Sequence, residues 1–148
     1  MPQTFADPVP SCVWAVQTNL ALATGFQDLW WAAPASSESG WGVNFTQQGN
    51  IIFVTWFTYD ANGKPTWFVA VAEKTGDKVY QGPISTVVGN PFNAVPWDMS
   101  KQVDTEVGST TITFVDGNNA TFSYTINGET QVKSITRQVF VPPGTVCQ

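Results

Sequence analysis

The sequence contains no histidine among its 148 residues. This excludes catalytic triads that use histidine as the base and metal sites with imidazole ligands. Charge is scarce too, since charged side chains make up 11% of the chain, against about 25% in typical soluble domains. The six basic residues are scattered and the net charge is −5. Nucleic acid is therefore not an expected partner, and anionic membrane surfaces are disfavoured for the same reason.

Long apolar runs are also missing. No stretch approaches the roughly 18–20 apolar residues that a membrane-spanning helix needs. The first residues, MPQTFADPVP, have no basic start and no apolar segment, so they do not form a signal peptide. We interpret Met1 as an added start on a mature domain whose own signal has been removed.

The chain has only two cysteines, Cys12 and Cys147, which stand near its two ends. A disulfide between them would tie both termini to the folded body and stabilise it by about 4–5 kcal/mol on the chain-entropy account. Such a bond persists only in an oxidising compartment. The pair therefore predicts a secreted, periplasmic or cell-envelope protein; two unrelated buried thiols are the alternative.

Aromatic residues are abundant, at 14% of the chain, and five of the seven tryptophans fall within residues 30–71. Aromatic and β-branched residues at this density, interrupted by turn signals, favour strands over helices. A chain of this length is normally one domain with a self-sufficient core. We expect an extended lead-in over residues 1–11 and a single domain over residues 12–148.

The pattern along the chain predicts an all-β protein. Residues 12–24 fit either a strand or a short helix, and the segment that contains Pro83 is expected to be an interrupted strand. Residues 87–103 are expected to form a long irregular connection. Eight or nine strands joined by tight hairpins are typical of an up-and-down antiparallel β-barrel, with a sandwich as the alternative. The clear strands cover residues 26–32, 40–47, 51–59, 66–72, 110–115, 120–126 and 131–140.

The strands at residues 51–59 and 66–72 are the most informative pair. Asn62-Gly63 lies between them and predicts a hairpin, because these two residues tolerate positive φ best. Both strands are apolar on both faces, which a sheet with one solvated face does not explain. We therefore expect the second face to be covered by the N-terminal segment, a neighbouring subunit or a ligand.

A resemblance rests on the pattern WW…ESGWG…TWFTYDxxGxPTWF within residues 29–71. It is similar to a tryptophan-rich β module that recurs in secreted and cell-envelope proteins of proteobacteria. That resemblance implies an exported bacterial protein and carries no settled activity. A vaguer likeness to avidin and lipocalin-like barrels rests on the strand count and on a tryptophan near the first strand, and no ligand is carried over from it.

Enzymatic chemistry has one remaining route, a pair of carboxylates. Glu38 is the best candidate because serines flank it and Trp41 follows it. A glycosidase needs a second carboxylate about 5 to 9.5 Å away, for which Asp60, Asp98 and Glu73 are candidates. The alternative is that Glu38 accepts hydrogen bonds from loop amides and holds the loop. We expect no catalysis, no metal and no cofactor.

The tryptophans carry the functional hypothesis. Trp30 and Trp31 must point to opposite sides of a strand, so at least one of them faces away from the core. Sugars stack on exposed indole rings while polar side chains bind their hydroxyls. The sequence therefore predicts a non-catalytic module that binds a glycan or another cell-envelope component. The alternatives are a barrel that encloses a small apolar ligand and a structural or adhesive module with a subunit interface, which would form a homo-oligomer. The expected ligand-binding residues are Trp31, Glu38, Trp41, Asn44, Trp56, Tyr59 and Trp67.

Overall fold

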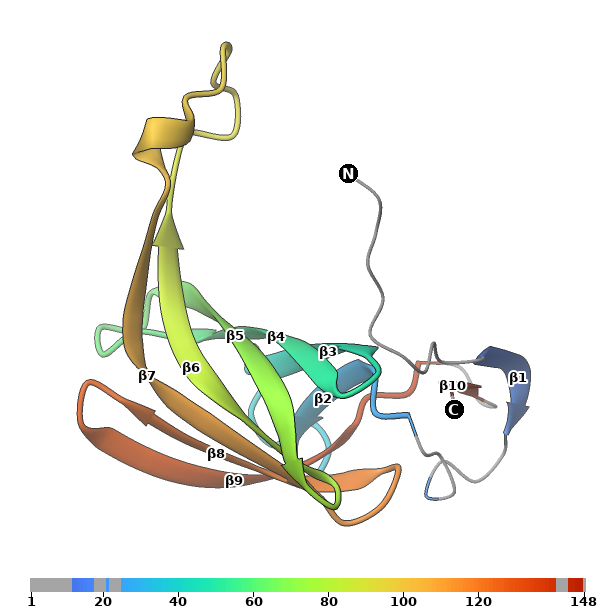
Figure 1. The fold of residues 1–148 in the computed structure, drawn as a ribbon. Helices are drawn as coiled ribbons and strands as arrows, with labels where there is room; N and C mark the ends of the chain where they lie inside the picture. The colour runs from blue at the N-terminus through green and yellow to red at the C-terminus, as the bar shows by residue number, and fades with distance from the viewer. Residues whose placement is uncertain (1–11, 18–20, 22–24, 141–143, 148) are drawn as a thin grey trace.

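The computed structural model describes residues 12–17, 21, 25–140 and 144–147, and its strands alternate with short turns (Figure 1). In chain order the elements are β1 (Cys12–Gln17), β2 (Asp28–Ala32), β3 (Gly42–Gln48), β4 (Ile51–Tyr59), β5 (Pro65–Gly76), β6 (Val79–Val88), the short 3₁₀ helix η2 (Met99–Lys101), β7 (Val103–Phe114), β8 (Asn119–Ile126), β9 (Glu129–Arg137) and β10 (Gly144–Cys147). Within these ranges, no helix is long and apolar enough to cross a membrane.

Strands β2 to β9 form a closed barrel in which each strand pairs with the next one along the chain. Every pairing is antiparallel, and β9 closes the ring on β2, where Trp30 lies opposite Arg137. The prediction of an up-and-down barrel is therefore confirmed, and the sandwich alternative is not adopted. Closure satisfies the backbone groups that would otherwise stand at open sheet edges.

The barrel interior is filled by side chains that alternate along the strands. The largest fully buried ones include Trp30, Phe45, Phe122, Ile52 and Ile84. Aromatic rings pack against one another in two groups, one that includes the stacked pair of Phe26 and Phe114 and one that includes the pair formed by Trp56 and Tyr124. The interior is thus packed with protein atoms.

The hairpin between β4 and β5 forms as the sequence predicts. Gly63 takes a positive φ of 75°. The Asp60 Oδ1 atom accepts hydrogen bonds from the backbone N–H groups of Asn62, at 2.8 Å, and Lys64, at 2.9 Å. These contacts make Asp60 a turn-stabilising residue.

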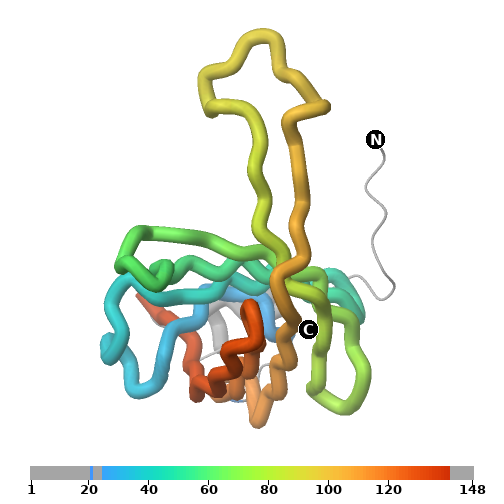
Figure 2. The backbone as a smooth tube through the Cα atoms, turned by 90° about the vertical axis from the view of Figure 1, so that its left-hand side faces the viewer, coloured from blue at the N-terminus to red at the C-terminus, as the bar shows by residue number. Residues whose placement is uncertain are grey.

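Two expectations about the middle of the chain are wrong. Pro83 does not interrupt its strand, because β6 runs through it and pairs Pro83 with Ser109 of β7. On the β5 side Pro83 has no paired residue, because the register passes from Ala70–Ile84 to Glu73–Gln81. The strand expected over residues 110–115 begins earlier, because β7 starts at Val103, and β6 and β7 thus continue past the barrel wall as an arm, residues 86–105 (Figures 1 and 2). The irregular connection expected over residues 87–103 is confirmed, because residues 89–102 form the loop with η2 at the tip of this arm.

Two glycines allow β6 and β7 to pass so close to their neighbours. A Cβ atom at Gly82 would lie 2.0 Å from the carbonyl oxygen of Val71, and one at Gly108 would lie 1.7 Å from that of Thr125. Any side chain there would force the backbones apart. Glycine is therefore required at both positions, where β6 approaches β5 and β7 approaches β8.

The ambiguous segment near the N-terminus contains a strand, β1, which pairs with β10 in a separate two-stranded sheet. The barrel proper thus spans β2 to β9 rather than the whole of residues 12–148. The lead-in over residues 1–11 lies outside the described residues. In the β1–β10 register Cys12 is directly opposite Cys147. The backbone pairing therefore brings the two cysteines together, and the disulfide itself stays a prediction.

Candidate functional site

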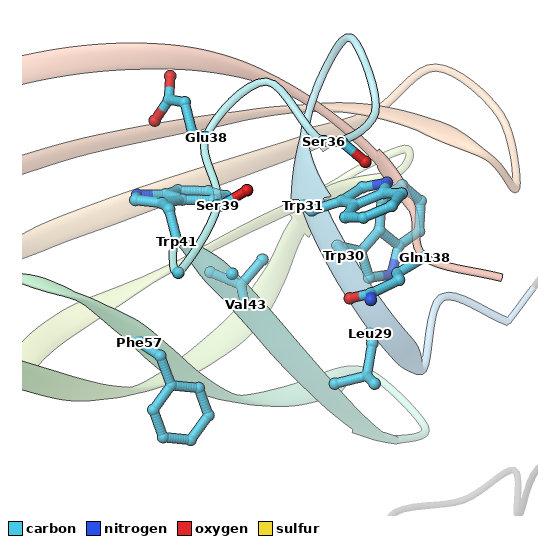
Figure 3. A pocket seen from close by; sticks show the side chains of 12 residues that line it. Leu29, Trp30, Trp31, Ser36, Glu38, Ser39, Trp41, Val43, Phe57 and Gln138 are labelled. Carbon is cyan, nitrogen blue, oxygen red and sulfur yellow. The ribbon is translucent and has the colours of Figure 1, made fainter. Parts of the chain in front are cut away.

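An open pocket of about 340 Å³ lies between the outer side of β2, the loop of residues 33–41 and the ends of β4 and β9 (Figure 3). It combines apolar and polar side chains, which is typical of sites for small ligands. Its apolar side chains come from Leu29, Trp30, Trp31, Trp41, Val43 and Phe57, and its polar ones from Ser36, Glu38, Ser39 and Gln138.

Strand alternation places the two neighbouring tryptophans of β2 on different sides. Trp30 is 1% exposed and its indole N–H donates to the carbonyl oxygen of Phe26 at 3.0 Å inside the barrel. Trp31 points outward and is half-buried, and its ring lies on one side of the pocket while Trp41 lies on the other (Figure 3). The prediction that one of the pair faces away from the core is confirmed.

Trp41 both lines the pocket and packs in the hydrophobic core. It is 8% exposed, and its ring packs edge-on against Trp56, at 6.1 Å, and Phe122, at 5.9 Å between ring centroids. The Lys133 Nζ atom lies 5.5 Å from the centre of the Trp41 ring, a cation–π distance. Trp41 is therefore held rigidly and offers little free surface.

The loop that carries Glu38 is fastened to β9. Both carboxylate oxygens of Glu38 accept hydrogen bonds from Lys133 Nζ, at 2.8 and 2.7 Å. The negative charge of Glu38 adds to the effect of burial in raising the pKa of Tyr124, whose hydroxyl donates to Gln131 at 2.7 Å. Glu38 thus holds the loop, as the structural alternative expected, although its partner is a lysine and not a backbone amide.

Tyr59 supports the same loop from the other side. Gly40 has a φ of 87°, and a Cβ atom there would lie 1.8 Å from the Tyr59 hydroxyl oxygen. The hydroxyl therefore packs directly on the Gly40 backbone, and both the dihedral angle and this contact require glycine. Tyr59 positions the loop but does not line the pocket.

Three of the seven predicted ligand-binding residues meet at the pocket, namely Trp31, Glu38 and Trp41. The structure does not bring the others there. Asn44 lies on the outer side of β3, in a shallow depression of about 290 Å³. Trp56 points into the barrel and is 4% exposed. Trp67 lines a separate groove of about 420 Å³ on the outer side of β5.

Several residues of the pocket were not predicted. Ser36 and Ser39 belong to the small polar loop that the sequence marks around Glu38, so a local signal existed. Phe57 was assigned only to an apolar face. Gln138 follows β9 and has no local signal, because only barrel closure brings that strand beside β2.

Three indole N–H groups in the described part of the chain are buried without a hydrogen-bond acceptor, those of Trp31, Trp41 and Trp56. An unsatisfied buried donor costs about 1–3 kcal/mol. Two of the three rings belong to the pocket walls. A ligand oxygen that reached either N–H would recover part of this cost.

The described residues contain no group of three or more acidic or cysteine side chains that could hold a metal ion. Comparisons with models of protein families, with curated proteins and with solved structures gave no significant match. The resemblance to the tryptophan-rich module therefore stays a prediction, and the pocket must be interpreted from its own chemistry.

Proposed function

We propose that this protein is a non-catalytic binding domain that takes a glycan in the pocket between Trp31 and Trp41. The single observation that carries the proposal is the composition of the pocket: the half-buried Trp31 ring and exposed Phe57 line it, together with two serine hydroxyls and the Gln138 amide. Aromatic rings accept the apolar face of a sugar ring, and a few fixed polar groups orient its hydroxyls.

The packed barrel interior argues against the apolar-ligand alternative. An internal gap beside Trp56 and Phe68 has an empty volume of about 160 Å³ but no room for a water molecule. An enclosed ligand would have to displace core aromatic rings. The pocket outside the barrel needs no such rearrangement.

The arrangement around Glu38 supports a binding role over hydrolysis. Glu38 is the only carboxylate that lines the pocket among the described residues, and Lys133 contacts both of its oxygens. Asp60, Asp98 and Glu73 do not line it. Glycoside hydrolysis by two carboxylates requires the second one within about 5 to 9.5 Å.

Replacing Trp31 with alanine is expected to weaken glycan binding about 30-fold, the effect of losing a stacking side chain worth about 2 kcal/mol. Titration of a saccharide panel followed by tryptophan fluorescence and calorimetry measures it. Trp67→Ala is the matched control, because Trp67 is also exposed on an outer strand face but lies in the other groove.

The control separates the possible outcomes. Loss of binding in Trp67→Ala but not in Trp31→Ala would move the site to the outer side of β5. Absence of binding to every saccharide would refute the glycan proposal. Saccharide turnover that disappears in Glu38→Gln would refute the non-catalytic role.

We further propose an exported, bacterial context with a Cys12–Cys147 disulfide. The direct opposition of the two residues in the β1–β10 register supports the bond, and disulfides persist mainly in oxidising compartments. Alkylation of the unfolded protein before and after reduction, read by mass spectrometry, is expected to label no thiol before and both thiols after. Two labelled thiols in the unreduced protein would contradict the bond.

A further inference from the structure

The arm is a two-stranded ribbon that stands out from the barrel wall (Figures 1 and 2). The ladder between β6 and β7 continues to Val88 and Val103, whereas the regular ladders to β5 and β8 end at Ser85 and Gly108. Apart from the hydrogen bond that the Asn127 N–H donates to the Val107 carbonyl oxygen, the strand residues described beyond those points pair only with each other. A two-stranded ribbon alone is marginally stable in water, so this arm gains from a surface that it can lie against.

The tip of the arm is apolar and exposed. Residues 89–97 contain no charged side chain. Phe92 is 98% exposed, Val95 94%, Trp97 55% and Met99 70%. Large apolar side chains gathered on a projecting loop mark an interaction surface.

Hydrogen bonds of Asn90 and Asp98 also hold the tip of the arm in one conformation. The Asn90 side-chain amide donates to the Asp98 carbonyl oxygen at 2.6 Å, and the Asp98 N–H donates back to Asn90 Oδ1 at 3.3 Å. The Asp98 carboxylate caps η2 by accepting from the Ser100 N–H and hydroxyl, at 3.0 and 2.7 Å. These contacts lower the pKa of Asp98. The apolar side chains are therefore presented by an ordered loop.

A second apolar surface lies at the foot of the arm, on the outer face of β4 and β5. Phe53 is 43% exposed, Trp67 45% and Val71 48%. The groove of about 420 Å³ described above combines this face with Val87 and Gln102 at the base of the arm. The sequence predicted that something must cover this face, and no described segment of the same chain does so.

We propose that a second copy of this chain covers the outer face of β4 and β5. The arm tip of each protomer lies in the partner's β4–β5 groove, and a twofold axis relates the two contacts. Each contact covers one arm tip and one β4–β5 face, and the twofold symmetry produces this contact two times in the dimer. A lipid surface is less well supported, because it would take up the tip and leave Phe53 and Trp67 in water.

The available area fits such a dimer. Aromatic side chains bury about 150–250 Å² each, so the exposed parts of Phe53, Trp67, Phe92 and Trp97 together offer about 500 Å² per protomer. Val71, Val95 and Met99 add to this. A stable interface needs about 800 Å² from each partner. The two surfaces together therefore reach the required range, whereas either one alone does not.

Sedimentation velocity over a wide range of concentration tests the proposal. The wild-type chain is expected to form a dimer. A tip variant, Phe92→Ser with Trp97→Ser, and a face variant, Phe53→Ser with Trp67→Ser, are each expected to raise the dimer Kd about 30-fold or more. All four residues are exposed, and circular dichroism checks that the variants fold. Val115→Ser and Val132→Ser, at 66% and 65% exposed positions elsewhere, are the controls and should dimerise normally.

Mixing the two variants distinguishes arm exchange from other pairings. The mixture contains one intact tip and one intact face, so one native contact is restored and the mixed dimer should be tighter than either variant alone. If arm paired with arm, or face with face, mixing would not restore a native contact. A mixed dimer no tighter than the variant dimers would therefore overturn the proposal. A wild-type monomer at all concentrations would also overturn it, and binding of that monomer to phosphatidylcholine vesicles, lost in the tip variant, would assign the tip to lipid. These readouts use no glycan and stand apart from the proposed ligand.

Discussion

Replacing Arg137 with methionine is expected to lower the free energy of unfolding by about 3–5 kcal/mol. Arg137 is 4% exposed. Its guanidinium group donates to the carbonyl oxygens of Gly25, Gln27 and Gly117, and it pairs with the Asp28 carboxylate at 3.1 Å. These partners belong to the entry to β2 and to the β7–β8 turn, so one side chain joins three parts of one barrel end.

The size of the effect follows from what the substitution leaves behind. Methionine fills much of the volume but donates nothing, so carbonyl groups that now accept hydrogen bonds would be buried without a donor. Burial lowers the pKa of Arg137, and the charge of Asp28 opposes that shift. Because an arginine pKa starts above about 12, the side chain stays charged at neutral pH. Its contribution to stability is therefore present across the ordinary pH range.

Urea denaturation followed by circular dichroism measures the loss. Arg137→Lys should recover little of it, because a single ammonium group cannot reach partners on several sides. Lys133→Met is the matched control, since the ion pair of Lys133 with Glu38 is partly exposed and worth about 1 kcal/mol or less. A loss below about 1 kcal/mol in Arg137→Met would show that Arg137 does not hold the barrel end together.

Replacing Phe122 with alanine is expected to cost about 3–5 kcal/mol as well, through the cavity that it leaves. Phe122 is 1% exposed. Its ring centre lies 5.9 Å from that of Trp41, 5.4 Å from that of Trp56 and 5.5 Å from that of Tyr124. Four aromatic rings thus meet at one place, and none of the other three can move into the space without losing its own contacts.

Denaturation curves measure the cost, and near-ultraviolet circular dichroism reports whether the packing of Trp41 and Trp56 loosens. Val132→Ala on β9, at a 65% exposed position, should change stability by no more than about 0.5 kcal/mol. Unchanged stability in Phe122→Ala would mean that the core can collapse around the deletion, contrary to the close packing described here.

The β4–β5 hairpin shows what local patterns can predict. The bounds of β4, the turn and the pairing of side chains by face follow from alternation and from Gly63, which are features of adjacent residues, whereas β5 runs past its predicted end at residue 72 to Gly76. The β6–β7 arm shows the opposite. Prolines and uncharged residues correctly indicate the loop at its tip, but no local pattern shows that β7 begins at Val103 or that β6 and β7 pair with each other beyond the wall.

The candidate site divides in the same way. Trp31, Glu38 and Trp41 lie close together in sequence, on the end of β2 and on the loop that follows it, and they meet at one pocket. Trp56 and Trp67 lie on the two strands of the same hairpin, β4 and β5. Strand alternation nevertheless places Trp56 in the core and Trp67 on the outer face. Alternation shows which residues share a face, but only closure of the barrel shows which face is inside.

From its own composition and periodicity, the chain determined an all-β barrel, a hairpin at Gly63 and a tryptophan-rich region with few catalytic groups. These properties depend on residues that are neighbours in the sequence, so the sequence alone predicts them. The tertiary structure decided which tryptophans are sealed, that Lys133 holds Glu38, that Gln138 reaches the pocket and that an apolar arm stands beside an apolar face. Each of these depends on contacts between residues far apart in sequence, whose register is set only when β9 closes on β2.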